Sequence, residues 1–262
     1  ASHPVFELYP GVSTGIEKRS FVEFRIWTSR GFLNGFRGEH NNALTAYQRA
    51  QSILEAFPSG NSRDRLLTEV YNSLGASHYY LGNYAQGLEL MRTVVQHLSK
   101  QNEGRVTTST IMASGLLGAL EVRTGNFARA EEIYRSNANE TRERFGTNSF
   151  LHVWQQESLA KSLVFQDKLQ EAELILEDAS KNNIDHHLAD TFADFLQTWR
   201  GFIQAQRGQW KQALELAKPI HSEADNHWRW YPLILWMNDE ASRYVTFRNK
   251  LFEELQRGRY PI

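Results

Sequence analysis

The sequence predicts an all-α protein built from a helical repeat of about 42 residues. Five segments share a turn-like pattern, and the first residue of each, called the anchor here, is Gly38, Gly82, Gly125, Asp167 or Gly208. The anchors follow one another in steps of 44, 43, 42 and 41 residues. Apolar residues then recur at helical spacing, as at Ala43, Leu44, Tyr47 and Ala50, and no alternating strand pattern competes over a comparable length.

Each repeat is expected to be a helix, a tight turn at the anchor and a second, antiparallel helix. Glycine suits the anchor because it takes the left-handed conformation at a helix C-terminus without a Cβ penalty. Small residues stand seven positions before the anchors, at Gly31, Gly75, Gly118, Ala160 and Gly201. Others stand five positions after them, at Ala43, Gly87, Ala130, Ala172 and Ala213. Small residues on both helices predict a close approach of the two backbones.

Short polar turns separate the repeats, and two further segments flank them. The turns are expected at residues 57–62, 100–104, 145–149 and 180–185. We expect residues 1–20 to form an irregular lead and residues 21–225 to form the solenoid. Residues 226–262, with Pro232 near the start of a helix, are expected to form capping helices. Alternatively, the natural chain continues and these helices pack onto further repeats.

The repeat resembles the tetratricopeptide repeat. The likeness lies in the small residues, the anchor glycines and the aromatic residues Trp27 and Tyr71, each eleven positions before its anchor, and it covers roughly residues 21–225. Standard members repeat every 34 residues, so the longer period is similar to that of kinesin light chains and MalT-like regulators. The resemblance implies an α-α superhelix of about five repeats, whose first helices line a concave ligand-binding face.

Composition narrows the function classes. Twenty-nine Lys and Arg against 30 Asp and Glu give a net charge of -1, so no direct nucleic-acid binding is expected. The absence of cysteine excludes disulfides, zinc ribbons, iron–sulfur clusters and cysteine nucleophiles. No apolar run approaches the roughly 20 residues of a membrane span. We expect a cytoplasmic protein, with the periplasm as the alternative. The sequence starts at Ala1, without an initiator Met and without the apolar core of a signal peptide, which indicates a processed chain or a piece of a longer one.

Motifs for catalysis, cofactors and metals are missing from the sequence. Gly82 and Gly87 have the spacing of a phosphate loop, but Leu88 and Glu89 follow where Lys and Ser or Thr would be needed. The adjacent His186–His187 would point about 100° apart on a helix, and no His-Glu-x-x-His occurs. The carboxylate pair Glu131–Glu132 is expected to be solvated. We therefore expect no catalytic residues, no metal, no cofactor and no enzymatic activity.

Function is expected on the concave face, at positions thirteen, ten, six and two before the anchors. The residues chosen there as candidate ligand contacts are Arg25, Thr28, Asn72, Tyr80, Arg123, Trp154, Glu157 and Lys161. Asn72 is the most peptide-like choice because one amide can both donate to and accept from an extended backbone. The phenylalanines at such positions are expected to pack between helices instead: Phe32, Phe36, Phe165, Phe195 and Phe202.

The sequence favours a protein-interaction module that binds a peptide or a partner protein in its concave groove. The first alternative is the sensing region of a larger, ATP-dependent transcriptional regulator, because four stretches resemble the repeats of MalT-like proteins: residues 53–58, Arg65, residues 70–75 and residues 82–84. In that family the region senses a small-molecule effector or an inhibitory protein. The second alternative is a periplasmic scaffold. This chain contains neither a phosphate loop nor a DNA-reading helix-turn-helix.

Overall fold

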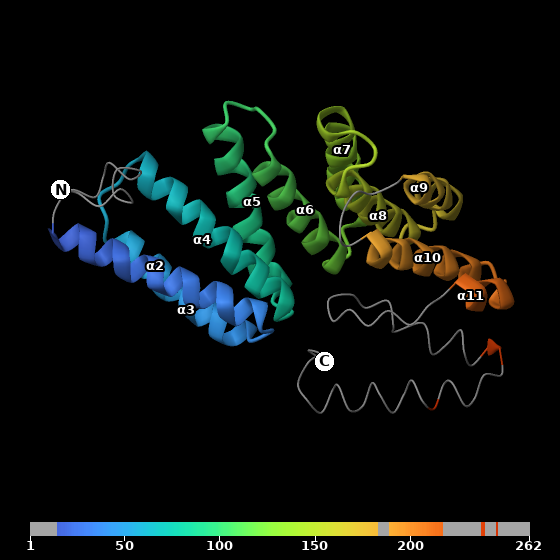
Figure 1. The fold of residues 1–262 in the computed structure, drawn as a ribbon, viewed down its shortest axis with the longest axis horizontal. Coiled ribbons are helices and arrows are strands. Elements are labelled where there is room, and N and C mark those ends of the chain that lie inside the picture. The colour runs from blue at the N-terminus through green and yellow to red at the C-terminus, as the bar shows by residue number, and fades with distance from the viewer. Residues whose placement is uncertain (1–14, 183–188, 217–236, 239–244, 246–262) are drawn as a thin grey trace. The chain divides into compact units, whose positions relative to one another are not determined.

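The described part of the chain is helical throughout. The computed structural model describes residues 15–182, 189–216, 237, 238 and 245, and within these residues it contains no strand (Figure 1). Contacts group the chain into two compact units, Ala1–Leu120 and Glu121–Ile262. The boundary between the units falls inside one helix, and each unit is described by itself below.

The helices follow the predicted repeat. The first unit contains α2 (Gly15–Phe36), α3 (His40–Glu55), α4 (Asn61–Tyr80), α5 (Tyr84–Gln101) and the main part of α6 (Thr108–Arg123). The second contains α7 (Phe127–Phe145), α8 (Phe150–Val164), α9 (Leu169–Lys181), α10 (Ala189–Gln206) and α11 (Trp210–Leu216). Helices within a predicted repeat pack against each other, as α2 does with α3 and α8 with α9. The prediction of an all-α chain of helix-turn-helix repeats is confirmed.

Every anchor turn has the same backbone geometry. The anchor glycines Gly38, Gly82, Gly125 and Gly208 have φ between +74° and +82°, as predicted. Asp167 adopts the same left-handed region with φ +60°, although it carries a Cβ. In each turn the N–H after the anchor donates to the carbonyl four residues before the anchor, as Glu39 does to Asn34 at 2.9 Å and Lys168 to Leu163 at 3.0 Å. This bond ends the first helix in a Schellman-type cap.

The small residues allow close packing, in two ways. A Cβ built on Gly87 would lie 3.3 Å from the carbonyl oxygen of Gly75, so the predicted approach of two backbones occurs in the second repeat. A Cβ on Gly75 would meet Met91 Sδ at 2.6 Å. A Cβ on Gly31 would lie 2.7 Å from the Tyr47 ring. The glycine seven positions before the anchor therefore makes room for the large residue nine positions after the anchor, which is Tyr47 in the first repeat and Met91 in the second.

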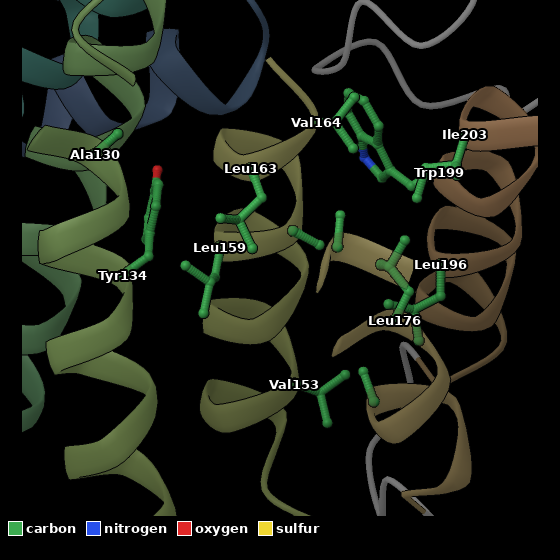
Figure 2. Close-up of a cluster of buried hydrophobic side chains, with 13 residues drawn as sticks. Ala130, Tyr134, Val153, Leu159, Leu163, Val164, Leu176, Leu196, Trp199 and Ile203 are labelled. Atoms are coloured by element: carbon green, nitrogen blue, oxygen red, sulfur yellow. The ribbon is translucent and has the colours of Figure 1, made fainter. Parts of the chain in front are cut away.

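Each unit has its own hydrophobic core. In the first, α2, α3 and α4 contribute Phe21, Phe24, Ala43, Tyr47, Ala50, Leu54, Leu66, Leu67, Val70 and Leu74. In the second, α7 to α10 surround a core that includes Tyr134, Leu159, Leu163, Leu176, Trp199 and Ile203 (Figure 2). The cores thus form both between the two helices of a repeat and where the second helix of one repeat packs against the first helix of the next.

Helix α8 is buried on nearly every side and carries polar residues inward. Gln155 accepts a hydrogen bond from the Asn137 amide of α7 at 3.0 Å. His152 Nδ1 lies 3.0 Å from the Ala138 carbonyl oxygen, and burial, the largest influence, lowers the pKa of this histidine. Such hydrogen bonds offset the cost of placing polar groups in the interior.

Two details depart from the sequence predictions. Helix α2 begins at Gly15, so residues 15–20 of the expected irregular lead are helical. Glu131, expected to be solvated, has a side chain only 14% exposed. Its carboxylate accepts hydrogen bonds from Arg135 at 2.9 Å, Lys168 at 2.6 Å and Gln166 at 2.8 Å. The expected capping segment 226–262 lies outside the described residues except for residues 237, 238 and 245.

Candidate binding cleft

The first unit contains a cleft of about 440 Å³ between α2 and α4, with α3 beneath. Its volume falls in the range of roughly 300–1,000 Å³ that is typical of ligand sites. Helix α2 contributes Phe24, Arg25, Thr28, Ser29, Phe32 and Leu33. Helix α4 contributes Glu69, Val70 and Ser73, and α3 contributes Tyr47. Apolar and polar side chains therefore meet in one concave surface.

The repeat register places these residues together. Arg25 and Glu69 both stand thirteen positions before their anchors, on the first helices of neighbouring repeats. Thr28 and Phe32 follow one and two turns later along α2. The structure thus brings two of the predicted contact residues, Arg25 and Thr28, into the cleft.

Hydroxyl groups contribute to the polar lining of the cleft, and among them Tyr47 is buried. Burial raises the pKa of the Tyr47 phenol above its usual value, and a hydrogen bond with Ser73 acts in the opposite direction. The Ser73 hydroxyl donates to the Glu69 carbonyl at 3.1 Å, and the Thr28 hydroxyl donates to the Arg25 carbonyl at 3.0 Å. Since each of these hydroxyl protons is used by its own helix, the serine and threonine oxygens are suited to accept hydrogen bonds from a ligand.

Charged and aromatic side chains occupy the exposed part of the cleft. Arg25 and Glu69 are both exposed and present opposite charges to the same space. Phe32 is 66% exposed, and Phe36, near the end of the same helix, is 86% exposed. The prediction that these two phenylalanines pack between helices is therefore wrong. The comparable prediction for Phe202 is confirmed, because its ring packs against the core of the second unit.

The remaining candidates in the first unit lie outside the cleft. Asn72 is half-buried on α4. Tyr80, at the end of α4, stacks on His40 with ring centroids 4.4 Å apart and an interplanar angle of 8°. Burial lowers the pKa of His40, which favours the neutral imidazole in this stack. Tyr80 is therefore part of a turn contact between the first two repeats.

In the second unit, the candidates on α8 gather around Trp199 of α10. Glu157 is 6% exposed and accepts a hydrogen bond from the Trp199 indole N–H at 2.8 Å. The Lys161 ammonium lies 5.4 Å from the centroid of the Trp199 ring. Trp154 packs against the core and stacks on Phe150. The buried carboxylate of Glu157 thus binds within the protein, which corrects its expected place on an open groove.

Two other phenylalanines and the last candidate have mixed exposure. Phe165, expected between helices, is 43% exposed and stacks on Phe127 with ring centroids 5.1 Å apart. Phe195 is half-buried on α10. Arg123 is half-buried at the end of α6.

Sequence reasoning missed the floor of the cleft. Tyr47 lies on the second helix of the repeat, whereas the expected contacts all lie on first helices. Ser29 and Ser73 stand nine positions before their anchors, outside the four positions expected to face a ligand. Tyr47 follows Ala43 by one helical turn, so it shares the face that meets the first helix. That spacing was the signal that could have identified it.

The described residues contain no group of three or more His, Asp or Glu side chains placed to hold a metal ion. Among the helices that the structure describes, none combines the length and the apolar character required to cross a membrane.

No protein-family model and no curated protein matches the sequence. Solved structures do match. BtubC (BKLC) from P. vanneervenii is 17% identical with a TM-score of 0.60, over 78% of this chain and 89% of that chain. The apo form of RapI is 15% identical with a TM-score of 0.59, over 89% of this chain and 77% of that chain.

A third structure is the Rap conjugation gene regulator of the plasmid pLS20 in complex with the Phr* peptide. It is 14% identical with a TM-score of 0.59, and the match covers 97% of this chain and 64% of that chain. The chain shares the helical fold of these proteins. At such low identities the likeness establishes the fold alone.

Proposed function

We propose that the chain is a non-catalytic interaction module whose cleft between α2 and α4 binds an extended peptide segment of a partner protein. The observation that carries the proposal is the lining of the cleft: an apolar wall, hydroxyl acceptors and two opposite charges around about 440 Å³. A few polar groups converging on a mostly apolar concavity are typical of a binding site.

An extended peptide suits this lining better than a helix does. Its backbone presents both donors and acceptors, whereas the backbone groups of a helix are used internally. The Ser73 oxygen can accept from a peptide N–H, and the Arg25 guanidinium can donate to a peptide carbonyl. Phe32 offers an apolar surface for a peptide side chain. The pLS20 regulator, which has a similar fold, provides a precedent because its structure holds a peptide.

Selection of peptides from a random phage-displayed library tests the proposal. We expect the purified wild-type chain to enrich a set of peptides, and fluorescence anisotropy of a selected peptide to show micromolar binding. Glu69 and Arg25 are both exposed, so Glu69→Lys and Arg25→Glu are expected to leave folding intact. Each is expected to weaken peptide binding about tenfold or more. Glu89→Lys, an exposed charge reversal on α5, is the matched control and is expected to leave the affinity unchanged. Peptides that bind both cleft variants as tightly as wild type would refute the site.

A small-molecule effector is the second candidate, because the volume of the cleft also fits a metabolite. This is the ligand that the sensing-region alternative requires. Isothermal titration with a panel of small metabolites separates the two candidates. Saturable binding of a metabolite that Glu69→Lys removes, with no peptide enriched, would favour the effector.

A further inference from the structure

Helix α2 exposes a face that the other first helices of the repeats bury. The residues twelve and five positions before an anchor lie on one face of the first helix. In α4 these are Val70 and Ser77, which are 1% and 4% exposed. The equivalent pairs in the other repeats, all at most 2% exposed, are Ala113 and Leu120, Gln155 and Ser162, and Leu196 and Ile203. In α2 the same positions hold Ile26 and Leu33, which are 59% and 52% exposed.

The neighbouring repeats show what covers this face. Val70 of α4 shares a core with Ala50 and Leu54 of α3, the second helix of the preceding repeat. Leu196 of α10 shares a core with Leu176 of α9 in the same way. The face is therefore built to receive a helix. On α2, the described residues provide no preceding helix, although the face is more apolar than several of its buried equivalents.

The exposed residues form one stripe along α2. Val22, which is 48% exposed, stands four residues before Ile26, and the 86% exposed Phe36 stands three residues after Leu33. Together Val22, Ile26, Leu33 and Phe36 span about four helical turns, since 3.6 residues make one turn. Exposed apolar stripes of this kind mark interaction surfaces. A helical partner that presents an apolar stripe of similar length would match it.

Charge indicates which kind of helix fits. Among the described side chains of α2, four are basic, namely Lys18, Arg19, Arg25 and Arg30, and one is acidic, Glu23. Glu23 is paired with Arg49 of α3 at 3.4 Å. On a helical projection Arg19 and Arg30 lie on one side of the stripe and Lys18 and Arg25 lie on the other. A second copy of α2 would bring like charges together, whereas acidic residues beside an apolar stripe would meet opposite charges.

We propose that the apolar stripe of α2 docks an amphipathic helix with acidic flanks, supplied by a partner protein. The helix would take the place that the second helix of a preceding repeat takes on α4, α8 and α10. This site is distinct in occupant and in key residues from the peptide cleft, because Val22, Ile26 and Phe36 do not line the cleft. The two sites share Leu33 and Arg25, so they are separated by Ile26→Glu for the stripe and Glu69→Lys for the cleft, since Ile26 does not line the cleft and Glu69 lies on α4.

Two synthetic helical peptides test the proposal. Both carry leucines at every a and d position over about four turns, and one is flanked by glutamates while the other is flanked by lysines. We expect the fluorescein-labelled glutamate peptide to bind the full chain at least about tenfold more tightly than the lysine peptide, with an affinity that falls as salt is raised. Equal binding of both peptides, or binding of neither, would overturn the proposal.

Matched variants locate the binding. Ile26→Glu is expected to weaken binding of the glutamate peptide at least about tenfold. Gln48→Glu, which adds the same charge to an exposed position on α3, is expected to leave it unchanged. Glu69→Lys in the cleft is also expected to leave it unchanged, so failure of the stripe and failure of the cleft are distinguishable. Binding that survives Ile26→Glu would overturn the assignment.

The other possible occupants have their own readouts. Because the chain lacks cysteine, Ile26→Cys and Val70→Cys each carry a single thiol at equivalent positions of successive repeats. We expect a maleimide to modify Ile26→Cys at least about a hundredfold faster than Val70→Cys. The reason is that a buried thiol reacts only after local unfolding, which costs free energy, whereas an exposed thiol reacts directly. Equal, slow modification of both variants would show that another part of the same chain covers the stripe. A concentration-dependent dimer that Ile26→Glu dissociates would show that a second copy of the chain covers it. Either result would overturn the proposal.

Discussion

Replacing Gly31 by alanine tests how the repeats pack. A Cβ at this position would lie 2.7, 2.8 and 2.9 Å from Cε1, Cζ and Cδ1 of Tyr47, whereas carbon atoms prefer about 3.5–4.0 Å. The ring would have to move by about 0.8 Å, in a side chain that is 9% exposed and packed in the core of the first unit. Overpacking of this kind costs about 1–3 kcal/mol.

Helix propensity acts in the opposite direction. Alanine is favoured over glycine in a helix by about 1 kcal/mol, which reduces the expected loss of unfolding free energy in Gly31→Ala to about 0–2 kcal/mol. Gly35→Ala, one turn later on α2, is the control because its Cβ would lie 3.9 Å from the Ala43 Cβ, an ordinary contact. That variant is expected to gain up to about 1 kcal/mol.

Urea denaturation followed by far-ultraviolet circular dichroism measures both variants. A third chain that combines Gly31→Ala with Tyr47→Leu is expected to recover part of the loss, with a coupling energy of about 1 kcal/mol between the two sites. If Gly31→Ala stabilises the chain as much as Gly35→Ala does, then the small residue before the anchor does not serve to admit the Tyr47 ring.

Three further substitutions have defined outcomes. Asp167→Gly is expected to raise the unfolding free energy by about 1 kcal/mol in urea denaturation, because φ +60° strains a residue with a Cβ; a loss would contradict this. Burial raises the pKa of Glu131, but hydrogen bonds from Lys168, Arg135 and Gln166 outweigh it and lower the pKa from 4.5 to about 2. The charged Glu131 therefore contributes to the free energy of unfolding above pH 4.5, and this contribution is lost as the pH falls toward 2. We expect Glu131→Gln to lower the free energy of unfolding by about 1–3 kcal/mol at pH 7 and to flatten its pH dependence between pH 4.5 and 2. An unchanged pH profile would refute that role. Ser149→Ala removes the hydroxyl that accepts the His152 N–H at 3.2 Å and should lower the melting temperature, at a cost of about 1 kcal/mol; an unchanged melting temperature would exclude the cap.

The repeat architecture could be predicted from the sequence because it depends on local rules. Glycine at the anchor specifies a left-handed backbone, and four of the five anchors are glycines with positive φ. The turn expected at residues 57–62 follows from Pro and Gly in the same way, and in the structure residues 57–60 lie between α3 and α4 while Asn61 and Ser62 begin α4. Arg25 and Thr28 also lie in one cleft because they are about one helical turn apart on α2.

Burial could not be predicted from spacing. Glu157 and Lys161 are one turn apart on α8, but the indole of Trp199, from a helix distant in sequence, makes one of them internal. The sequence predicts that Phe32 and Phe36 pack between helices. On α2 they are exposed, since what packs on a helix depends on the chain around it rather than on its own sequence.

Hydrogen–deuterium exchange of the full chain, with and without a saturating selected peptide, tests the central proposal most directly. We expect slower exchange in residues 25–33 of α2 and 69–73 of α4, the segments that line the cleft, and no change in the helices of the second unit. In Glu69→Lys at the same peptide concentration, the protection should be lost. Protection confined to α8 and α10, or a peptide that binds without slowing exchange in α2 and α4, would contradict the assignment of the cleft as the peptide-binding site.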